Sequence, residues 1–197
     1  CLEVPRQRGA IDSEADFVIL HPRGRLVLEV KGGEIGCQGG RWYRVRKGHR
    51  ESIAPPFYQA RDNSYEIREY LERLCGRESV EARMPFNQAM VFTDVDFNAQ
   101  TFECPQERIV DRAELAGYTL AEIVARLLDE FGVGFIEGGW PGSNPKDVEF
   151  FERARDMQWK HALITAFGST CRVKGGPEDD ANIKALIDSK TPVCTIF

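Results

Sequence analysis

The sequence contains no run of 18 apolar residues, so it predicts no membrane-spanning helix and no membrane partner. It has no basic segment followed by an apolar one near its start, and no signal peptide is expected. Excess positive charge is also absent. The net charge is −5, which excludes a polycation that coats nucleic acid, so any nucleic-acid site must be a local patch.

Closely spaced cysteines are missing as well. The nearest two of the six are Cys171 and Cys194, so the sequence has no CxxC pair and no zinc knuckle. We expect reduced, partly buried thiols and a cytoplasmic location. The sequence begins with Cys1 and ends inside the apolar run 192–197, which favours a piece of a longer chain.

Hydrophobic patterning predicts two architectures in succession. In the first part, β-rich runs at 15–21 and 25–31 predict a hairpin, and helical spacing of apolar residues predicts a helix over 56–75. Strands then alternate with helices, which is typical of parallel βαβ units. We expect an α/β fold with domains at 1–118 and 119–197, joined somewhere between about 118 and 132.

The predicted hairpin carries a candidate constellation. Residues two apart on a strand share a face, so Glu29 and Lys31 point the same way, about 7 Å apart. If the loop has two residues, His21 pairs with Gly24, and Asp16 then lies opposite Glu29. A three-residue loop would turn Asp16 to the other face unless a bulge corrects it.

Such a group suits a divalent cation. Converging carboxylates repel each other unless a cation lies between them, and Mg²⁺ favours one or two carboxylates with waters. A lysine beside them can orient water and stabilise the charge that develops during phosphodiester hydrolysis. The alternative, which spacing alone favours, is an ordinary Glu–Lys pair on an exposed sheet face.

Six stretches between residues 6 and 118 together resemble a known family. They are EADFVILHPRG from Glu14, LVLEVKGG from Leu26, GGRWY from Gly39, PFYQA from Pro56, VF at 91–92 and DRAEL from Asp111. This ordered set resembles the nuclease-related (NERD) domain of the PD-(D/E)XK nuclease superfamily.

That resemblance implies a restriction-endonuclease-like mixed sheet with helices, and a nuclease that acts on DNA with Mg²⁺ or Mn²⁺. It implies Asp16 and Glu29 as metal ligands, and Lys31 as the catalytic lysine. Gln59 is then an accessory catalytic residue on the following helix, and Glu14 an additional acid. Such domains often precede a helicase, which is a candidate partner, although this sequence has no GxxxxGK[ST] motif.

Residues 41–50 hold five Arg or Lys residues and no acid. Basic groups that grip phosphates, with aromatic rings that stack on bases, would make this run a DNA-binding surface. The candidate residues are Arg41, Trp42, Arg44, Arg46, Lys47 and Arg50. The alternative is a solvated edge hairpin whose charges block aggregation.

The second domain has a glycine-rich turn between a strand and a helix, GFIEGGWPGSNPKD from Gly134. Such a turn can present N–H groups to an anion, or it can simply be a tight loop with a capped helix. With AFGST at 166–170, EDDANIKAL at 178–186 and TPVCTIF at 191–197, this stretch closely resembles citramalate synthase over about residues 131–197.

This second resemblance implies an acyltransferase that condenses pyruvate with acetyl-CoA on a divalent metal, inside a TIM barrel. It implies a partial (β/α) barrel here, limited to the second to fourth strands. The candidate substrate-side positions are Glu137, Ser143, Asn144, Ser169 and Thr170.

The first-strand motif of that family, Asp-Thr-Thr-Leu-Arg-Asp-Gly, does not occur in the sequence. We therefore expect an incomplete, inactive synthase segment whose partners would be the remaining barrel segments. Three functions stay open. They are a Mg²⁺-dependent nuclease, a citramalate-type acyltransferase, and a non-catalytic DNA-binding module.

Overall fold

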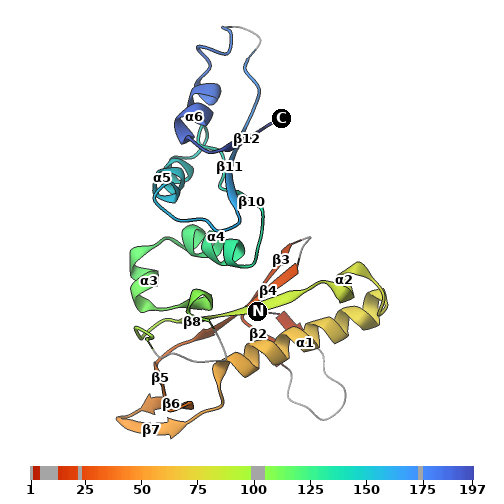
Figure 1. Cartoon of the computed structure of the whole chain (residues 1–197), viewed down its shortest axis with the longest axis vertical. Coiled ribbons are helices and arrows are strands. Elements are labelled where there is room, and N and C mark those ends of the chain that lie inside the picture. Colours follow the sequence, from red (N-terminus) through yellow and green to blue (C-terminus); the bar gives the residue numbers. More distant parts are fainter. Residues whose placement is uncertain (1, 5–12, 22–23, 99–104, 173–174) are drawn as a thin grey trace. The chain divides into compact units, whose positions relative to one another are not determined.

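The structure, a computed structural model, describes residues 2–4, 13–21, 24–98, 105–172 and 175–197 (Figure 1). It shows an α/β protein whose chain divides into two compact units, Cys1–Tyr118 and Thr119–Phe197. The division falls at one end of the range in which sequence patterning placed the join.

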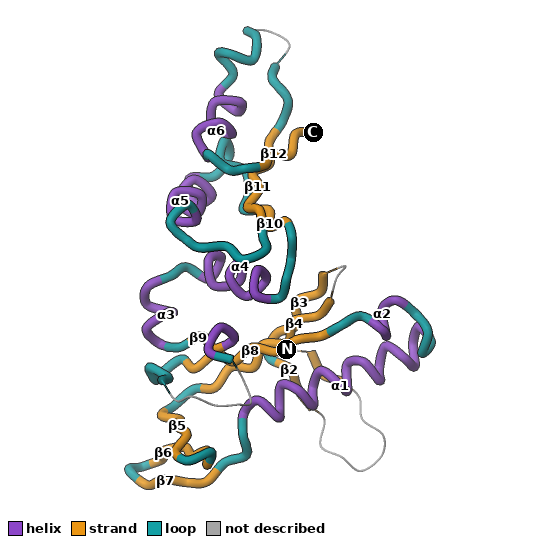
Figure 2. Tube along the Cα trace, viewed as in Figure 1, coloured by secondary structure: helices purple, strands orange, loops and turns teal. Residues whose placement is uncertain are grey.

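A four-stranded mixed sheet forms the centre of the first unit (Figure 2). Its strands, in spatial order, are β3 (Phe17–His21), β4 (Gly24–Lys31), β8 (Phe86–Phe92) and β9 (Ile109–Val110). β3 is antiparallel to β4, whereas β4, β8 and β9 are parallel to one another. His21 pairs with Gly24, which confirms the first of the two registers considered for the hairpin.

Two smaller antiparallel sheets and the helices complete the first unit. One sheet pairs β1 (Leu2–Val4) with β2 (Ser13–Ala15), and the other is β5 (Glu34–Gln38), β6 (Arg41–Arg46) and β7 (His49–Ser52). The helices are α1 (Pro56–Cys75), α2 (Val80–Arg83), the short 3₁₀ helix η1 (Gln106–Arg108) and α3 (Arg112–Gly117).

Helix α1 covers one face of the central sheet, packing on β4 and β8. Pro56 occupies the first turn, where its missing N–H costs no hydrogen bond, and Gly76 ends the helix with a φ of +91°. The helix predicted over 56–75 is therefore confirmed.

The core between α1 and the sheet is rich in aromatic rings. It consists of Ile35, Trp42, Phe57, Ala60, Met90, Phe92, Phe97 and Ile109. These residues come from the central sheet, from α1, from the β5–β6 hairpin and, for Phe97, from the segment after β8. Burial of this cluster therefore fixes the small sheet to the large one.

The second unit is built on a parallel sheet in the order β10 (Phe135–Glu137), β11 (Leu163–Gly168), β12 (Val193–Ile196). Helix α5 (Pro145–Ala154) connects β10 to β11, and α6 (Ala181–Ser189) connects β11 to β12. The predicted succession of βαβ units is confirmed. The core cluster contains Ile136, Ile164 and Ala166 from the strands, with Phe151 and Leu186 from the helices.

Helix α4 (Leu120–Glu130) opens the second unit and is fixed at both ends by carboxylates. Thr119 and Glu122 form the capping box that their spacing predicts. Near the other end, the buried Asp129 carboxylate accepts the backbone N–H groups of residues 160, 161 and 162 at 2.7–2.8 Å. Asp129 thereby holds the segment that leads into β11.

No helix in the described part of the chain has both the length and the apolar character needed to cross a bilayer.

Candidate functional site

Glu29, Lys31 and Gln59 form one hydrogen-bonded group. The Lys31 ammonium donates to Glu29 Oε1 at 2.5 Å and to Gln59 Oε1 at 2.7 Å. Glu29 and Lys31 leave β4 on the same face because they are two residues apart, and α1 brings Gln59 to that face. The fold thus gathers three of the four residues that the resemblance implied as catalytic.

The group lies where β4 passes from the core to the surface. The Glu29 side chain is 2% exposed and the Lys31 side chain 17% exposed. A buried carboxylate is costly without a partner, and the charge-assisted bond from Lys31 offsets that cost. This burial argues against the alternative of an ordinary surface pair.

Asn63, which sequence reasoning missed, completes the surroundings of Glu29. Its Nδ2 donates to Glu29 Oε2 at 3.4 Å, and the residue is 3% exposed. Asn63 lies four residues after Gln59, so both point from the same side of α1. That spacing, together with a polar amide on the buried face of a helix, was the signal available in the sequence.

Asp16 lies at a bend between β2 and β3, outside either strand. Its Oδ2 accepts the N–H of Val30 at 2.7 Å, so a side chain takes the place of a backbone carbonyl from the neighbouring strand. The strand predicted over 15–21 is therefore interrupted at Asp16. No hydrogen bond or ion pair joins Asp16 to Glu29 or Lys31 in the described residues. Its contact near the group is with the backbone N–H of Val30, which lies between Glu29 and Lys31 in the sequence.

Asp94 fixes the chain directly after Lys31. Its Oδ2 accepts the Thr93 hydroxyl and the Gly33 N–H, each at 2.7 Å. These two hydrogen bonds hold the pKa of the Asp94 carboxyl below its ordinary value, and the bond from Thr93 has the larger effect. The side chain of Glu14, the predicted additional acid, lies outside the described residues.

The predicted basic surface lies on the small sheet. Arg41, Arg44 and Arg46 occupy β6, Lys47 lies in the following turn with a φ of +50°, and Arg50 lies on β7. All five side chains are exposed. They are therefore accessible to a ligand, which fits both the predicted DNA-binding surface and the alternative of a solvated edge hairpin.

Trp42 contradicts its predicted role. It is 2% exposed, and its ring is stacked on Phe97 at 5.4 Å and meets the Phe57 ring edge-on at 5.5 Å. The ring is therefore part of the core and has no face for a nucleic-acid base. The sequence could not distinguish these outcomes because alternation along β6 does not reveal which face meets the core.

In the second unit, the candidate substrate-side residues follow the carboxyl ends of β10 and β11. Glu137 ends β10, and Ser169 and Thr170 follow β11, so they lie at the same edge of the parallel sheet. Asn144 caps α5, accepting the Lys146 N–H at 3.0 Å. Ser143 is exposed in the turn before α5, and its backbone N–H donates a hydrogen bond to the Trp140 carbonyl.

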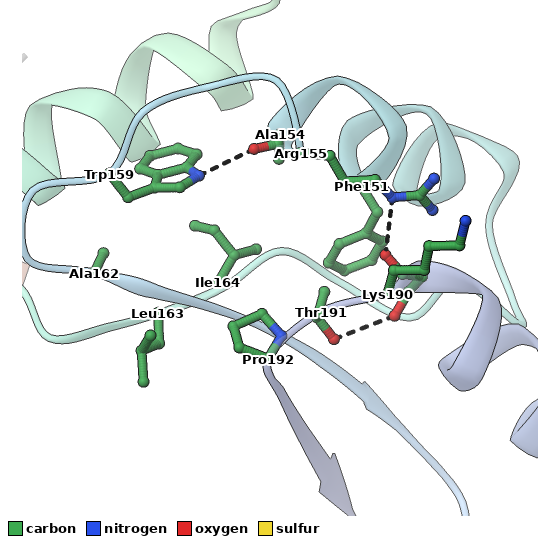
Figure 3. A pocket seen from close by; sticks show the side chains of 11 residues that line it. Phe151, Ala154, Arg155, Trp159, Ala162, Leu163, Ile164, Lys190, Thr191 and Pro192 are labelled. Carbon is green, nitrogen blue, oxygen red and sulfur yellow. Dashed lines mark hydrogen bonds between the residues drawn. The ribbon is translucent and has the colours of Figure 1, made fainter.

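A cavity of about 410 Å³ lies at the opposite edge of this sheet (Figure 3). It is lined by the ends of α5 and α6 and by the residues that lead into β11 and β12. Figure 3 shows Trp159 at its wall, donating its indole N–H to the Ala154 carbonyl at 3.0 Å. The cavity therefore shares no residue with the candidate substrate-side set.

Comparison with known proteins finds two similarities in the chain. Residues 2–93 match the family model of the nuclease-related domain. The chain is also similar over 74 residues to (R)-citramalate synthases, at 57% identity for that of Streptomyces coelicolor, 54% for Geobacter sulfurreducens and 50% for Aquifex aeolicus.

The similar stretch is 37–38% of this chain but only 14% of each synthase. No solved structure matches the chain. Both resemblances drawn from the sequence are confirmed: residues 2–93 match the nuclease-related domain, and 74 residues of the chain are similar to (R)-citramalate synthases. The family match ends before the DRAEL stretch at Asp111, so it covers less than the range 6–118 over which the sequence resembles that family.

Proposed function

We propose that the first unit is a Mg²⁺-dependent nuclease domain of restriction-endonuclease-like fold, which hydrolyses DNA phosphodiesters. The carrying observation is the buried Glu29 carboxylate in contact with the Lys31 ammonium, with Gln59 on the same ammonium. The match of residues 2–93 to the nuclease-related domain supports this assignment.

The donor set fits a magnesium site that substrate completes. Asp16 and Glu29 would supply the carboxylate oxygens, and Mg²⁺ often takes one or two carboxylates plus phosphate oxygens and waters. The Asp16 carboxylate accepts the N–H of Val30, the residue that follows Glu29 on β4. Within the described residues no three His, Cys, Asp or Glu side chains gather into an all-protein cage. A bound Mg²⁺ or Mn²⁺ would supply positive charge beside the phosphate.

Lys31 carries the remaining chemistry. Its ammonium is held between Glu29 and Gln59, so it is oriented before substrate arrives. A fixed positive charge at this place stabilises the negative charge that develops on the phosphate as water attacks. Asn63 holds the second oxygen of Glu29 and so keeps the carboxylate in position.

Cleavage of plasmid DNA with Mg²⁺ tests this proposal. Glu29→Gln and Lys31→Met should each lower the rate by at least about 100-fold. The first removes a carboxylate that would hold the cation, and the second removes the positive charge that stabilises the transition state. Glu69→Gln, an exposed carboxylate on α1, is the matched control and should cleave at the wild-type rate. Circular dichroism verifies that the variants fold.

Equal cleavage by the wild-type protein and both site variants would assign the activity to a contaminant and reject the mechanism. Cleavage that persists without a divalent cation would reject the metal requirement alone.

We propose that the second unit is a partial (β/α) barrel of the citramalate-synthase type without condensation activity of its own. Its parallel sheet with α5 and α6 as crossovers supports the barrel assignment. The first-strand motif that supplies a catalytic arginine and a metal ligand in that family does not occur in the sequence. Formation of citramalate from pyruvate and acetyl-CoA by the purified chain would overturn this proposal.

A further inference from the structure

The small sheet β5–β6–β7 is inserted between the two elements that carry the site. Two residues separate Lys31, at the end of β4, from the start of this sheet, and the sheet leads into α1, whose first turn contains Gln59. Asp94 holds the junction by accepting the Gly33 N–H at 2.7 Å. Both ends of the sheet are thus fixed beside the candidate site.

Packing of the Trp42 ring fixes the middle of the small sheet beside the site. The ring stacks on Phe92 at 6.2 Å, and Phe92 is the register partner of Lys31 on the neighbouring strand. Trp42, Arg44 and Arg46 share one face of β6 because side chains alternate along a strand. That face therefore leads from the core beside Lys31 outward across two guanidinium groups.

The sheet is basic although the chain is acidic. Between residues 34 and 52 there are five Arg or Lys residues against Glu34 and Glu51, whereas the whole chain has a net charge of −5. Arg44 and Arg46 are about 6.6 Å apart along the strand. Each strand of B-form DNA carries one phosphate per 3.4 Å of helix axis, so this spacing lets the two residues bind different phosphates.

The aromatic rings of this basic run are not available to nucleic-acid bases. Trp42 is buried against Phe57 and Phe97. The Tyr43 ring has the Arg50 guanidinium over it at 4.3 Å, and a Cβ at Gly36 would lie 2.5 Å from Tyr43 Oη. Proteins that bind single strands stack bases on exposed aromatic side chains, and neither aromatic ring of this sheet has a face available for stacking.

We propose that β5–β6–β7 binds the sugar–phosphate backbone of a DNA duplex beside the site, through the face that carries Arg44 and Arg46. This inference rests on the proposed function and narrows its substrate class to double-stranded DNA. Binding of this kind depends on charge, reads no sequence and weakens steeply with salt.

Fluorescence anisotropy with a labelled duplex of about 25 base pairs tests the proposal on the full chain, in Ca²⁺ or EDTA so that no cleavage intervenes. The wild-type protein should bind the duplex at least about tenfold more tightly than either single strand. Arg44→Gln/Arg46→Gln should weaken duplex binding at least about tenfold and reduce the slope of log K against log salt by about two.

Arg77→Gln/Arg83→Gln is the matched control. It removes the same charge from exposed residues beyond the far end of α1, a helix about 30 Å long. It should leave duplex affinity within about twofold of the wild type. Equal losses in the two double variants would mean that net charge alone governs binding, and would overturn the proposal.

The remaining outcomes separate this inference from the nuclease proposal. Duplex binding that depends on Arg44 and Arg46, without cleavage in Mg²⁺, supports the binding face and removes the catalytic assignment. If cleavage depends on Glu29 but Arg44→Gln/Arg46→Gln binds and cuts the duplex as well as the wild type, the binding face alone is overturned. Tighter binding of single strands, or no measurable binding of either DNA, also overturns it.

Discussion

At the scale of single residues, carboxylates in this chain act mainly through backbone N–H groups and one cationic neighbour. Asp16 and Asp129 each hold a segment in place by accepting main-chain N–H groups, and Glu29 is held by Lys31. The spacing of Glu29 and Lys31 predicted their shared face because the side-chain period of a strand is two. The hydrogen bond from the Val30 N–H to Asp16 was not predictable, since it depends on where β3 begins.

Glu122 provides a pH-dependent contribution at this scale. Burial raises its pKa, but the hydrogen bonds from the Thr119 N–H and hydroxyl and from Arg153 outweigh burial, so the folded-state pKa lies below its ordinary value. A depressed pKa gives stability that is present above the unfolded-state pKa and lost as pH falls through the folded-state value.

We therefore expect Glu122→Gln to lower the free energy of unfolding at about pH 7 and to have a much smaller effect at about pH 3. Urea unfolding of both proteins at the two pH values measures this difference. An effect of Glu122→Gln that is the same at both pH values would show that the ionised carboxylate contributes nothing.

At the scale of elements, the long helix and the hairpin register follow from sequence, whereas the outer strands of the small sheet, β5 and β7, do not. Proline in the first turn and a terminal glycine mark α1 clearly. The short strands β5 and β7 carry no long apolar alternation, so only their tertiary contacts define them. For the same reason Trp42 could not be assigned to the core in advance.

Trp42→Leu should lower the free energy of unfolding of the first unit by about 3 kcal/mol, because a fully buried aromatic ring is lost and a cavity remains. Tyr58→Leu is the control, since Tyr58 is 41% exposed and should change stability by no more than about 0.5 kcal/mol. Denaturant titrations followed by circular dichroism give both values. A similar small loss in the two variants would mean that the core does not depend on the indole.

At the scale of the whole molecule, each buried cluster in the described part of the chain belongs to one unit. The clusters of the first unit lie within residues 15–109, and that of the second lies within residues 125–186. The change from a hairpin-rich sheet to alternating strands and helices was visible in the sequence because the two architectures have different hydrophobic periods. The detailed contents of the site were not, since Asn63 reaches Glu29 only after α1 has packed on β4.

Separate cores predict separate local stabilities. Trp42→Leu should raise hydrogen exchange in β4–β8 and leave β10–β12 unchanged, whereas Asp129→Asn should do the reverse. Hydrogen–deuterium exchange followed by mass spectrometry resolves the two regions in one experiment. Increased exchange throughout the chain in either variant would contradict the division into two cooperative units.

The insertion of β5–β6–β7 between Lys31 and Gln59 has a consequence for engineering. Because β4 pairs with β8 and α1 packs on both strands, the turns at 39–40 and 47–48 can be exchanged while β4 and α1 stay in place. If the sheet binds DNA as proposed, a designer can change the substrate preference by grafting another hairpin at the same place, without altering Lys31 or Gln59.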